Sequence, residues 1–215
     1  MNLKGAAPES FGAVTAWLYR TTAERAVAPL HRWIGAEIPI EQGRLLDVGC
    51  GPGRFDRLLA AARPGLDVVG LDQSAAMLRQ AARGPALPNL EFRLGTLSSA
   101  GFREAFDFAV SVLSFHHWEE PEAELSAAHR ALRPGGRFWI YEPDPEAPDA
   151  EIRRDHAPLW GFLRLPPACH RVLFRGHGFT RREAEEVVRP AVARTPFREL
   201  TVSPRGSTLR FELRK

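Results

Sequence analysis

The feature that most constrains the fold is an alternation of short apolar runs with helical segments through the middle of the chain. Runs rich in Val, Ile, Leu and Phe occur at residues 44–49, 66–71, 90–94, 106–113 and 137–142. Segments with helical periodicity and helix-ending residues separate them, at residues 54–63, 74–83 and 121–132. Continuously apolar strands are buried on both faces, which is typical of βαβ units. The pattern therefore predicts an α/β fold around a parallel sheet.

The flanking segments carry further signals. The pattern of residues 10–38 predicts one or two amphipathic helices ahead of the first strand. A capping box that begins at Thr180 predicts a helix to about residue 188. Alternating runs at residues 198–202 and 208–213 flank the sequence Ser-Pro-Arg-Gly-Ser, which is typical of a hairpin. We therefore expect helices in front of the sheet and a hairpin behind it.

Length and composition indicate one globular domain. The chain has 215 residues, of which 44% are hydrophobic and 26% charged, a mixture that neither disordered nor membrane-spanning chains have. No apolar run approaches the roughly 20 residues of a transmembrane helix, and the first residues lack the order of a secretory signal. We therefore expect a cytoplasmic chain without a membrane span.

Charge is unevenly distributed along the chain. The first 150 residues hold 15 basic and 19 acidic side chains, whereas the last 65 hold 14 and 7, so the net charge of +3 conceals a basic C-terminal part. A basic part of this kind suggests an anionic partner. Arginines on a solvated helix explain the same numbers without any partner.

The segment most informative about function is LLDVGCGPGRF, from Leu45 to Phe55, where a buried strand leads through a glycine-rich turn into a helix. Glycines let the backbone turn sharply and let a ligand approach it closely. The helix that follows offers free N–H groups to an anionic part of that ligand. The next strand ends in VVGLD, so that Asp72 lies about 20 residues further on, where a carboxylate can accept both hydroxyls of a ribose. Together these features predict a nucleoside cofactor.

A nicotinamide dinucleotide fits this segment poorly, because its fingerprint requires glycine where this chain has Arg54. Instead, the chain resembles the class I S-adenosylmethionine-dependent methyltransferases through four motifs in order: LLDVGCGPGRF, VVGLDQSAAML, FDFAVSVLSFHHW and LRPGGRFWIYEP. The resemblance covers residues 43–143, nearly half of the chain. Within the family it is similar to the small-molecule branch, the group of the ubiquinone and menaquinone C-methyltransferases.

The resemblance implies a Rossmann-like, doubly wound sheet of seven strands with helices on both faces. Most strands would be parallel, and the C-terminal hairpin would add an antiparallel strand. It also implies a single domain over residues 1–215. Within that domain we expect a helical cap at 1–42, a cofactor-binding half at 43–143, and a substrate-side half with the hairpin at 144–215.

The resemblance also assigns cofactor contacts for S-adenosylmethionine, whose product is S-adenosylhomocysteine. From the methionine end through the ribose to the adenine, the expected contacts are Asp47, Gly49, Cys50, Gly51, Asp72, Gln73, Met77, Thr96 and Leu97. Ser111 and Val112 would lie beneath the bound cofactor, at the end of the fourth strand. Tyr19 corresponds to a tyrosine by which relatives close over the cofactor. Core packing is an equally simple explanation for Tyr19, and it also competes for Met77.

Thr96 is a departure from the family pattern. Relatives usually have an acid at this position, which bonds the adenine amine, and a threonine hydroxyl is a weaker partner. Adenine recognition would then depend more on the backbone of Leu97, and cofactor binding could be weaker than in relatives.

Two adjacent histidines follow the fourth strand. His116 is the first candidate for a base or for a group that orients the acceptor, and His117 is the second. Both histidines also fit a simple loop position. Glu142 and Asp144 could hold an acceptor, although solvated loop acids explain them better. We expect no metal site, because two cysteines and the spacing of Cys169, His170 and His177 match no ligand pattern.

These observations predict a methyltransferase that acts on a small-molecule acceptor. If the basic C-terminal part contributes to binding, it favours an anionic acceptor. An RNA or protein methyltransferase is an alternative that uses the basic C-terminal part, but LSFHHW lacks the Asn-Pro-Pro-aromatic element of resembling base-modifying enzymes. A non-catalytic S-adenosylmethionine-binding protein is a second alternative. The identity of the acceptor, the atom that is methylated and the oligomeric state are not encoded in any recognisable motif.

Overall fold

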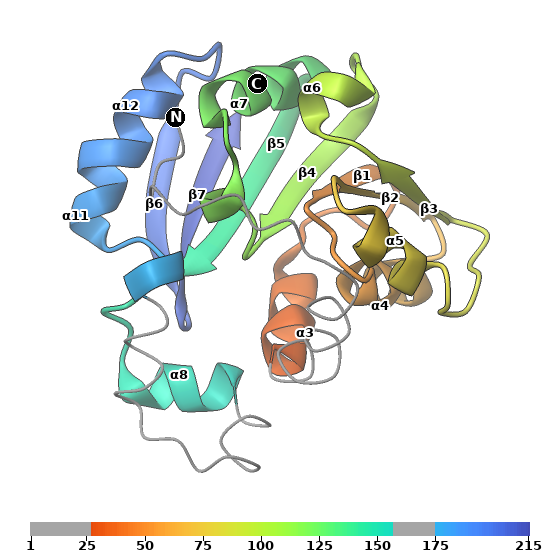
Figure 1. The fold of residues 1–215 in the computed structure, drawn as a ribbon, viewed down its shortest axis with the longest axis horizontal. Helices are drawn as coiled ribbons and strands as arrows, with labels where there is room; N and C mark the ends of the chain where they lie inside the picture. Colours follow the sequence, from red (N-terminus) through yellow and green to blue (C-terminus); the bar gives the residue numbers. More distant parts are fainter. Residues whose placement is uncertain (1–26, 157–174) are drawn as a thin grey trace.

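A computed structural model describes residues 27–156 and 175–215 of the chain. Its centre is a seven-stranded sheet in the order β3-β2-β1-β4-β5-β7-β6 (Figure 1). The strands are β1 Gly43–Val48, β2 Leu66–Asp72, β3 Leu90–Leu94, β4 Phe106–Val112, β5 Leu132–Pro143, β6 Leu200–Arg205 and β7 Thr208–Arg214. The first five strands pair in parallel, whereas β7 runs antiparallel to both β5 and β6. The predicted doubly wound sheet with an antiparallel C-terminal strand is confirmed.

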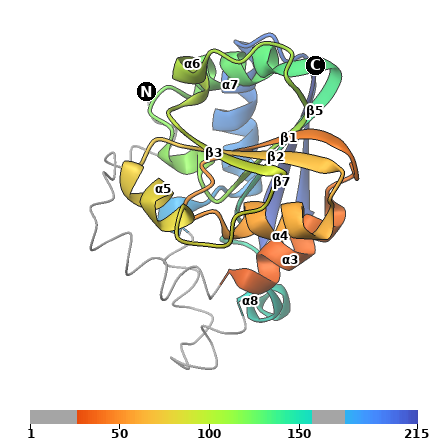
Figure 2. The same cartoon turned by 90° about the vertical axis from the view of Figure 1, so that its right-hand side faces the viewer.

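Helices cover both faces of this sheet (Figure 2). The helices are α3 Ala28–Glu37, α4 Arg54–Ala62, α5 Ala75–Ala81, α6 Leu97–Ala100, α7 Pro121–Ala131, α8 Asp149–Asp155, α11 Arg181–Glu183 and α12 Arg189–Ala193, with a 3-10 turn at Phe115–His117 and a π-helical turn at Ala184–Val188. In the edge-on view, α3 and α4 lie on one side of the sheet, and α6 and α7 lie on the other. The central strands β1, β2, β4 and β5 are therefore mostly buried, as their continuous apolar runs predict.

Neighbouring side chains of one strand enter two separate cores. Leu45 of β1 packs with Phe55 and Leu59 of α4, on the face that α3 and α4 cover. Leu46, the next residue, packs on the opposite face together with Leu125 of α7. Both leucines are completely buried. Packing on both faces holds the parallel strands β1, β2 and β4 in place, and their carboxyl ends lie at a common edge of the sheet. The glycine-rich turn begins at this edge.

The C-terminal helix and the hairpin are both present, but their boundaries differ from the predicted ones. The helix that begins after Thr180 does not end near residue 188 but continues through the π-helical turn to Ala193. Pro190 lies just after that turn, and a local π-helix is one way to accommodate a proline inside a helix. The hairpin is also tighter than its five-residue connection suggests, because β6 continues through Pro204. As β6 is an edge strand, a proline there removes no ladder hydrogen bond.

No helix in the described ranges has both the length and the apolar character needed to cross a membrane. The cytoplasmic location stays a prediction.

Candidate active site

The turn after β1 contains three glycines with left-handed backbone conformations. Their φ angles are 79° at Gly49, 55° at Gly51 and 73° at Gly53. A Cβ on Gly49 would collide with the Ser114 side chain, and one on Gly53 would collide with the Phe92 ring, so these two glycines permit close packing. A Cβ on Gly51 would meet nothing within 4 Å, because Gly51 faces a cavity. Gly51 is therefore the glycine at which a ligand can approach the backbone.

Asp72 connects this turn to the next helix. It is the last residue of β2, and its carboxylate accepts the N–H of Gly51 at 2.8 Å and the N–H of Ser74 at 2.7 Å. Burial raises the pKa of Asp72, and these two backbone donors act in the opposite direction. Ser74 caps α5, since its hydroxyl accepts the N–H of Met77. Asp72 also lines the cavity, in the position expected of a ribose-binding carboxylate.

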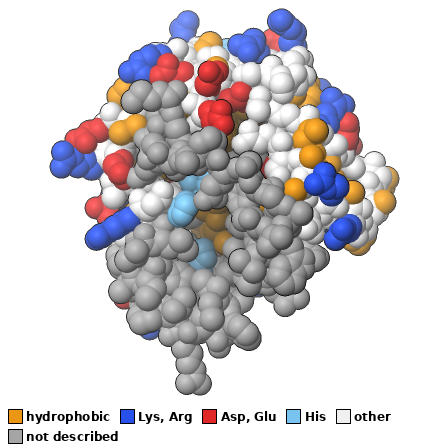
Figure 3. All heavy atoms as spheres, in the orientation of Figure 1, with side chains coloured by type: hydrophobic (Ala, Val, Ile, Leu, Met, Phe, Trp, Pro, Cys, Tyr) orange, Lys and Arg blue, Asp and Glu red, His pale blue; other side chains and the backbone are white. Residues whose placement is uncertain are grey.

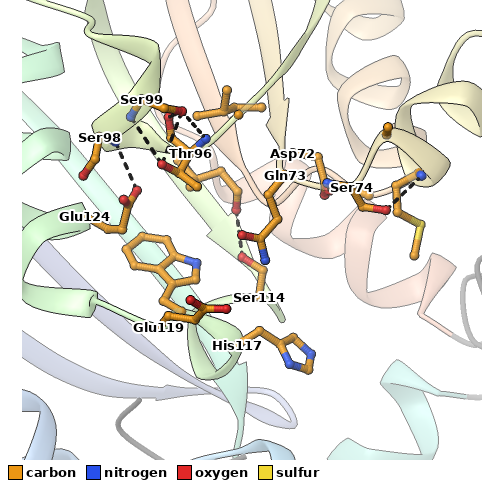
Figure 4. A pocket seen from close by; sticks show the side chains of 18 of the residues that line it. Asp72, Gln73, Ser74, Thr96, Ser98, Ser99, Ser114, His117, Glu119 and Glu124 are labelled. Carbon is orange, nitrogen blue, oxygen red and sulfur yellow. Dashed lines mark hydrogen bonds between the residues drawn. The ribbon is translucent and has the colours of Figure 1, made fainter. Parts of the chain in front are cut away.

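The cavity has a volume of about 1020 Å³ and lies at the carboxyl edge of the parallel strands (Figure 4). This edge is where open α/β sheets bind ligands. Seven of the residues predicted from the sequence line it: Gly49, Gly51, Asp72, Gln73, Met77, Thr96 and His117. On the molecular face in Figure 3, histidine side chains lie near the centre and acidic side chains lie above them. Half of the twelve predicted cofactor residues are thus brought to one cavity, together with one of the two predicted histidines.

Five of the predicted cofactor residues are not on the described cavity wall: Asp47, Cys50, Leu97, Ser111 and Val112. Cys50 is buried, and burial raises the pKa of its thiol well above the usual value, so it is a neutral packing group. The hydroxyl of Ser111 is bonded to that of Ser114, which donates to the carbonyl of Val48 at 2.8 Å. Tyr19 lies outside the described residues.

Asp47 has a buried acid beside it that no motif indicated. Asp56 belongs to the first turn of α4 and is fully buried, while Asp47 is 2% exposed. Burial raises the pKa of Asp47 well above its usual value, and the charges of Asp56 and Asp72 raise it further. Burial also raises the pKa of Asp56 to about 7. The Asp47–Asp56 pair therefore retains a proton close to neutral pH.

Thr96 caps the short helix α6. Its hydroxyl accepts the N–H of Ser99, and the hydroxyl of Ser99 accepts the N–H of Thr96 at 2.8 Å, which completes a capping box. A carboxylate is nevertheless present at this helix end, because Glu124 of α7 accepts the N–H of Ser98 at 3.3 Å (Figure 4). Glu124 also lines the cavity. The end of α6 thus has an acid, which comes from a different element than the family pattern suggests.

The loop after β4 carries both predicted histidines. Leu113 has a φ of 55°, which is uncommon for a residue with a Cβ, and the chain then enters the 3-10 turn. His117 lines the cavity, whereas His116 is only 4% exposed. Burial lowers the pKa of His117 to about 4, with the neighbouring His116 and His177 adding to the effect, so His117 is neutral at neutral pH.

Glu142 is fully buried, and its description as a solvated loop acid was wrong. Its Oε2 lies 2.5 Å from Nδ1 of His116, and its Oε1 accepts the N–H of Phe115 at 2.7 Å. Asp144 is buried as well, at 3% exposure. The physical reason is the C-terminal hairpin: β7 pairs with β5 through Glu142 as far as Pro143, and the N–H of Asp144 donates to the carbonyl of Ser207 in the hairpin turn at 3.0 Å.

The sequence predictions missed several polar residues of the cavity wall, among them Ser114, Glu119 and Glu124. Ser111 and Ser114 are three residues apart at a strand end, a spacing that could have suggested a turn held by two hydroxyls. The two glutamates flank Pro121, at the start of α7, where acids are common because they favour the helix dipole. No sequence signal distinguishes such acids from ordinary ones.

The order of the strands, the glycine turn and Asp72 define a Rossmann-like nucleoside-binding domain. A family model described as a methyltransferase domain matches residues 46–140. A trans-aconitate 2-methyltransferase of Variovorax paradoxus is 33% identical over 179 residues, covering 72% of this chain and 68% of that protein. The chain belongs to the class I S-adenosylmethionine-dependent methyltransferase family, and the prediction from the four motifs is confirmed.

Other relatives match over shorter parts. A ubiquinone biosynthesis O-methyltransferase of Cereibacter sphaeroides is 33% identical over 118 residues, which cover 53% of this chain and 46% of that protein. The chain spans only about a third to a half of the length of several curated relatives. The crystal structure of a candidate S-adenosylmethionine-dependent methyltransferase from Methanococcus maripaludis has the same fold, with a TM-score of 0.80 at 18% identity over 98% of this chain and 96% of that one.

Proposed function

We propose that this chain transfers a methyl group from S-adenosylmethionine to a small-molecule acceptor. The observation that carries the proposal is the 2.8 Å hydrogen bond from Gly51 to Asp72, on the wall of a large cavity at the carboxyl edge of the sheet. The names of the relatives support it, since they are a trans-aconitate and a ubiquinone biosynthesis methyltransferase. A volume of about 1020 Å³ is sufficient for a nucleoside cofactor and a small acceptor together.

The described residues fit this cofactor. Gly51 leaves the backbone open to the cavity, and Asp72 offers a carboxylate for the ribose hydroxyls. Gln73 and Met77 would line the adenine, where a thioether packs well on a ring face. For the adenine amine we assign the carboxylate of Glu124, which lies at the same helix end as Thr96.

The remaining predicted cofactor residues would act from below the cavity wall. The Asp47–Asp56 pair brings negative charge beneath the turn that would hold the cationic methionine end. The buried Cys50, Leu97 and Ser111 and the partly buried Val112 would support the wall by packing. The contacts of Tyr19 stay a prediction.

When bound, S-adenosylmethionine supplies a methyl carbon on a sulfonium sulfur that is already activated for displacement. The residues of this chain then have to align the acceptor, exclude water and remove its proton. We assign the last task, or the orientation of the acceptor, to His116. Because Glu142 holds Nδ1 of His116 at 2.5 Å, Nε2 is the nitrogen that can act on an acceptor. His117, which lies on the cavity wall, is the second candidate.

The acceptor that these side chains favour is neutral or cationic. The described wall carries four carboxylates and one guanidinium, namely Asp72, Glu119, Glu120, Glu124 and Arg79. Three of the C-terminal arginines, whose charge suggested an anionic acceptor, form surface ion pairs: Arg182 with Glu186, Arg189 with Glu185 and Arg194 with Glu122. Solvated arginines are thus the simpler explanation of the basic C-terminal part, and the alternative of an RNA or protein substrate loses its main argument.

We further propose that residues 1–42, 43–143 and 144–215 are the cap, the cofactor half and the substrate half of one domain. The pairing of β7 with β5 supports this division, because the last segment completes the sheet that the middle segment begins.

A ligand-binding experiment tests the cofactor assignment. S-adenosylmethionine and S-adenosylhomocysteine should raise the melting temperature, whereas NAD should not. Gly51→Ala should abolish that rise, since its Cβ would occupy the cavity. Gly101→Ala is the matched control, because Gly101 also has a positive φ of 65° and open space around it but lies outside the cavity wall. Stabilisation by NAD alone, or an unchanged response of Gly51→Ala, would reject the assignment.

A second experiment separates the three functional hypotheses. Methyl release from S-adenosylmethionine is measured against fractionated metabolites and against bulk RNA. A small-molecule methyltransferase yields a methylated metabolite. An RNA methyltransferase binds bulk RNA with a strong salt dependence. A non-catalytic binding protein responds to S-adenosylhomocysteine and releases no methyl group in any fraction.

A further inference from the structure

Three histidines from two distant parts of the chain meet beside the cavity. One ring nitrogen of each of His116, His117 and His177 lies within 4.8 Å of the other two. The ring centroids are 3.9 Å apart for His116 and His117, 5.3 Å for His116 and His177, and 6.1 Å for His117 and His177. The sequence indicated no metal site, because His177 was considered with Cys169 and His170, which lie outside the described residues. The structure gives His177 different neighbours.

We propose that His116, His117 and His177 bind a divalent transition-metal ion of the Zn²⁺ type through their imidazole nitrogens. Imidazole is a preferred ligand of zinc, nickel, copper and iron, and carboxylate-selective ions such as Mg²⁺ are not expected here. Three protein ligands leave at least one coordination position open, which is the pattern of catalytic and not of structural zinc sites.

Glu142 provides the hydrogen-bond acceptor that the second ring nitrogen of a metal-binding histidine usually has. A ligating histidine commonly donates its other ring N–H to a carboxylate, which fixes the ring and makes the free nitrogen more basic. The 2.5 Å contact between Nδ1 of His116 and Oε2 of Glu142 provides this arrangement and leaves Nε2 for the ion. Glu142 is fully buried, and within the described part of the chain its ion-pair partner is His116. A buried carboxylate needs positive charge nearby, which an ion bound to His116 supplies.

The geometry requires a small adjustment on binding. With zinc–nitrogen distances of about 2.0–2.1 Å, two nitrogens on a tetrahedral ion are about 3.4 Å apart. The nitrogens of the cluster lie within 4.8 Å of one another, so the rings must close by at most about 1.4 Å. Rotation of the side chains of His117 and His177, which are half-buried, is sufficient for such a change.

The role of the ion rests on the proposed function, whereas its binding does not. His117 belongs to the cavity wall, so the open coordination position adjoins the space assigned to the acceptor. An acceptor hydroxyl or carbonyl oxygen bound there would be oriented and polarised by the ion. In this arrangement His116 acts on the acceptor through the ion and does not take the proton itself.

Titration of the untagged, chelator-treated protein with Co²⁺ and with Zn²⁺ tests the site. Co²⁺ should give a visible absorption band with one ion per chain, and Zn²⁺ should displace it. His177→Ala and His117→Ala should each weaken binding at least about 100-fold, and Glu142→Gln should weaken it about 10- to 100-fold. His129→Ala is the matched control, because His129 packs against Phe197 and is not part of the cluster. The metal affinity of this variant should stay within twofold of that of the parent.

The outcomes separate this proposal from the proposed function. S-adenosylhomocysteine binding is measured on each protein, so a variant that retains it has an intact cofactor site; where His177→Ala fails to fold, His177→Gln replaces it. No binding of either ion by the parent overturns the metal site, and so does undiminished binding by both His177→Ala and His117→Ala. Metal binding without any response to S-adenosylhomocysteine keeps the site and rejects the proposed function.

Discussion

Two regions at the cavity are held together by different kinds of contact. On one side, which we call the glycine corner, Gly51 and Asp72 meet through a backbone N–H group. Beside His117 of the cavity wall lies the histidine corner, where His116, His177 and Glu142 meet through side chains alone. Both corners contain a buried or half-buried carboxylate. At the glycine corner it is satisfied by backbone donors, and at the histidine corner an imidazole is one of its two partners.

This difference decides what each corner controls. A glycine turn and a capping serine fix the backbone locally, so a side chain there can be removed without opening the core. The buried carboxylate of Glu142 joins β5 to the loop after β4, so its removal leaves donors without an acceptor inside the protein. We therefore expect changes at the glycine corner to lower cofactor affinity and changes at the histidine corner to lower stability.

The largest effect is expected from Asp72→Ala. The variant loses two hydrogen bonds from ribose hydroxyls to a charged acceptor, and bonds of that kind contribute about 1.5–3 kcal/mol each. The affinity for S-adenosylhomocysteine, measured by calorimetry, should fall at least about 100-fold. The melting temperature should change little, because water in the cavity can replace the carboxylate. Asp67→Ala, an exposed position on the same strand, serves as the control. A loss of less than about fivefold would remove the ribose assignment.

Glu142→Ala should show the opposite behaviour. The N–H of Phe115 and the ring of His116 lose their hydrogen-bond acceptor in a buried site. The free energy of unfolding should therefore fall by about 2–4 kcal/mol. Affinity for S-adenosylhomocysteine should stay within about twofold in the folded protein, since no assigned cofactor contact is lost. Denaturant unfolding checks the first expectation, with the exposed Glu146→Ala as control. If Glu142→Ala lowers cofactor affinity and leaves stability unchanged, the comparison between the corners fails.

The same contrast explains how much could be predicted from the sequence. The five parallel strands and the glycine corner follow from apolar runs, glycines and caps, which act over a few neighbouring residues; β3 lies at the predicted residues 90–94. The early start of β5 was missed, because Pro134 and Gly135 look like the end of an element and only pairing with β4 makes Leu132 part of a strand. The burial of Glu142 and the approach of His177 depend on tertiary packing, which no local pattern reports.

A buried acid pair beneath the glycine corner predicts a pH dependence. In the folded chain the pKa of Asp56 is raised from 3.8 to about 7, and that of Asp47 is raised as well. The folded state therefore holds more protons than the unfolded state between about pH 4 and 7, so stability should fall as the pH rises through this range. Asp72 adds to the repulsion, and Arg57 partly opposes it at Asp56.

Asp56→Asn should flatten this dependence, because an amide stays neutral and can donate to Asp47. At pH 8 the variant should melt at least about 2–4 °C higher than the parent, a shift that corresponds to about 1 kcal/mol in a domain of this size. At pH 5 the two proteins should differ less. Thermal melts across pH 4–8 check this expectation, with Asp67→Asn as the control. A variant that retains the slope of the parent would show that this pair does not hold the proton.

The smallest effect is expected at the adenine end of the glycine corner, where Glu124 provides an acid that position 96 lacks. Glu124→Gln replaces a charged acceptor with a neutral one, so affinity for S-adenosylhomocysteine should fall by about fivefold, or 1 kcal/mol. Glu122→Gln, on the same helix but paired with Arg194, should have no such effect. The decisive measurement is the double variant, because Thr96→Asp keeps the helix cap and returns an acid to the end of α6. If Thr96→Asp restores the affinity lost in Glu124→Gln, the two positions are alternative sources of one adenine contact; if it does not, Glu124 is only a helix cap.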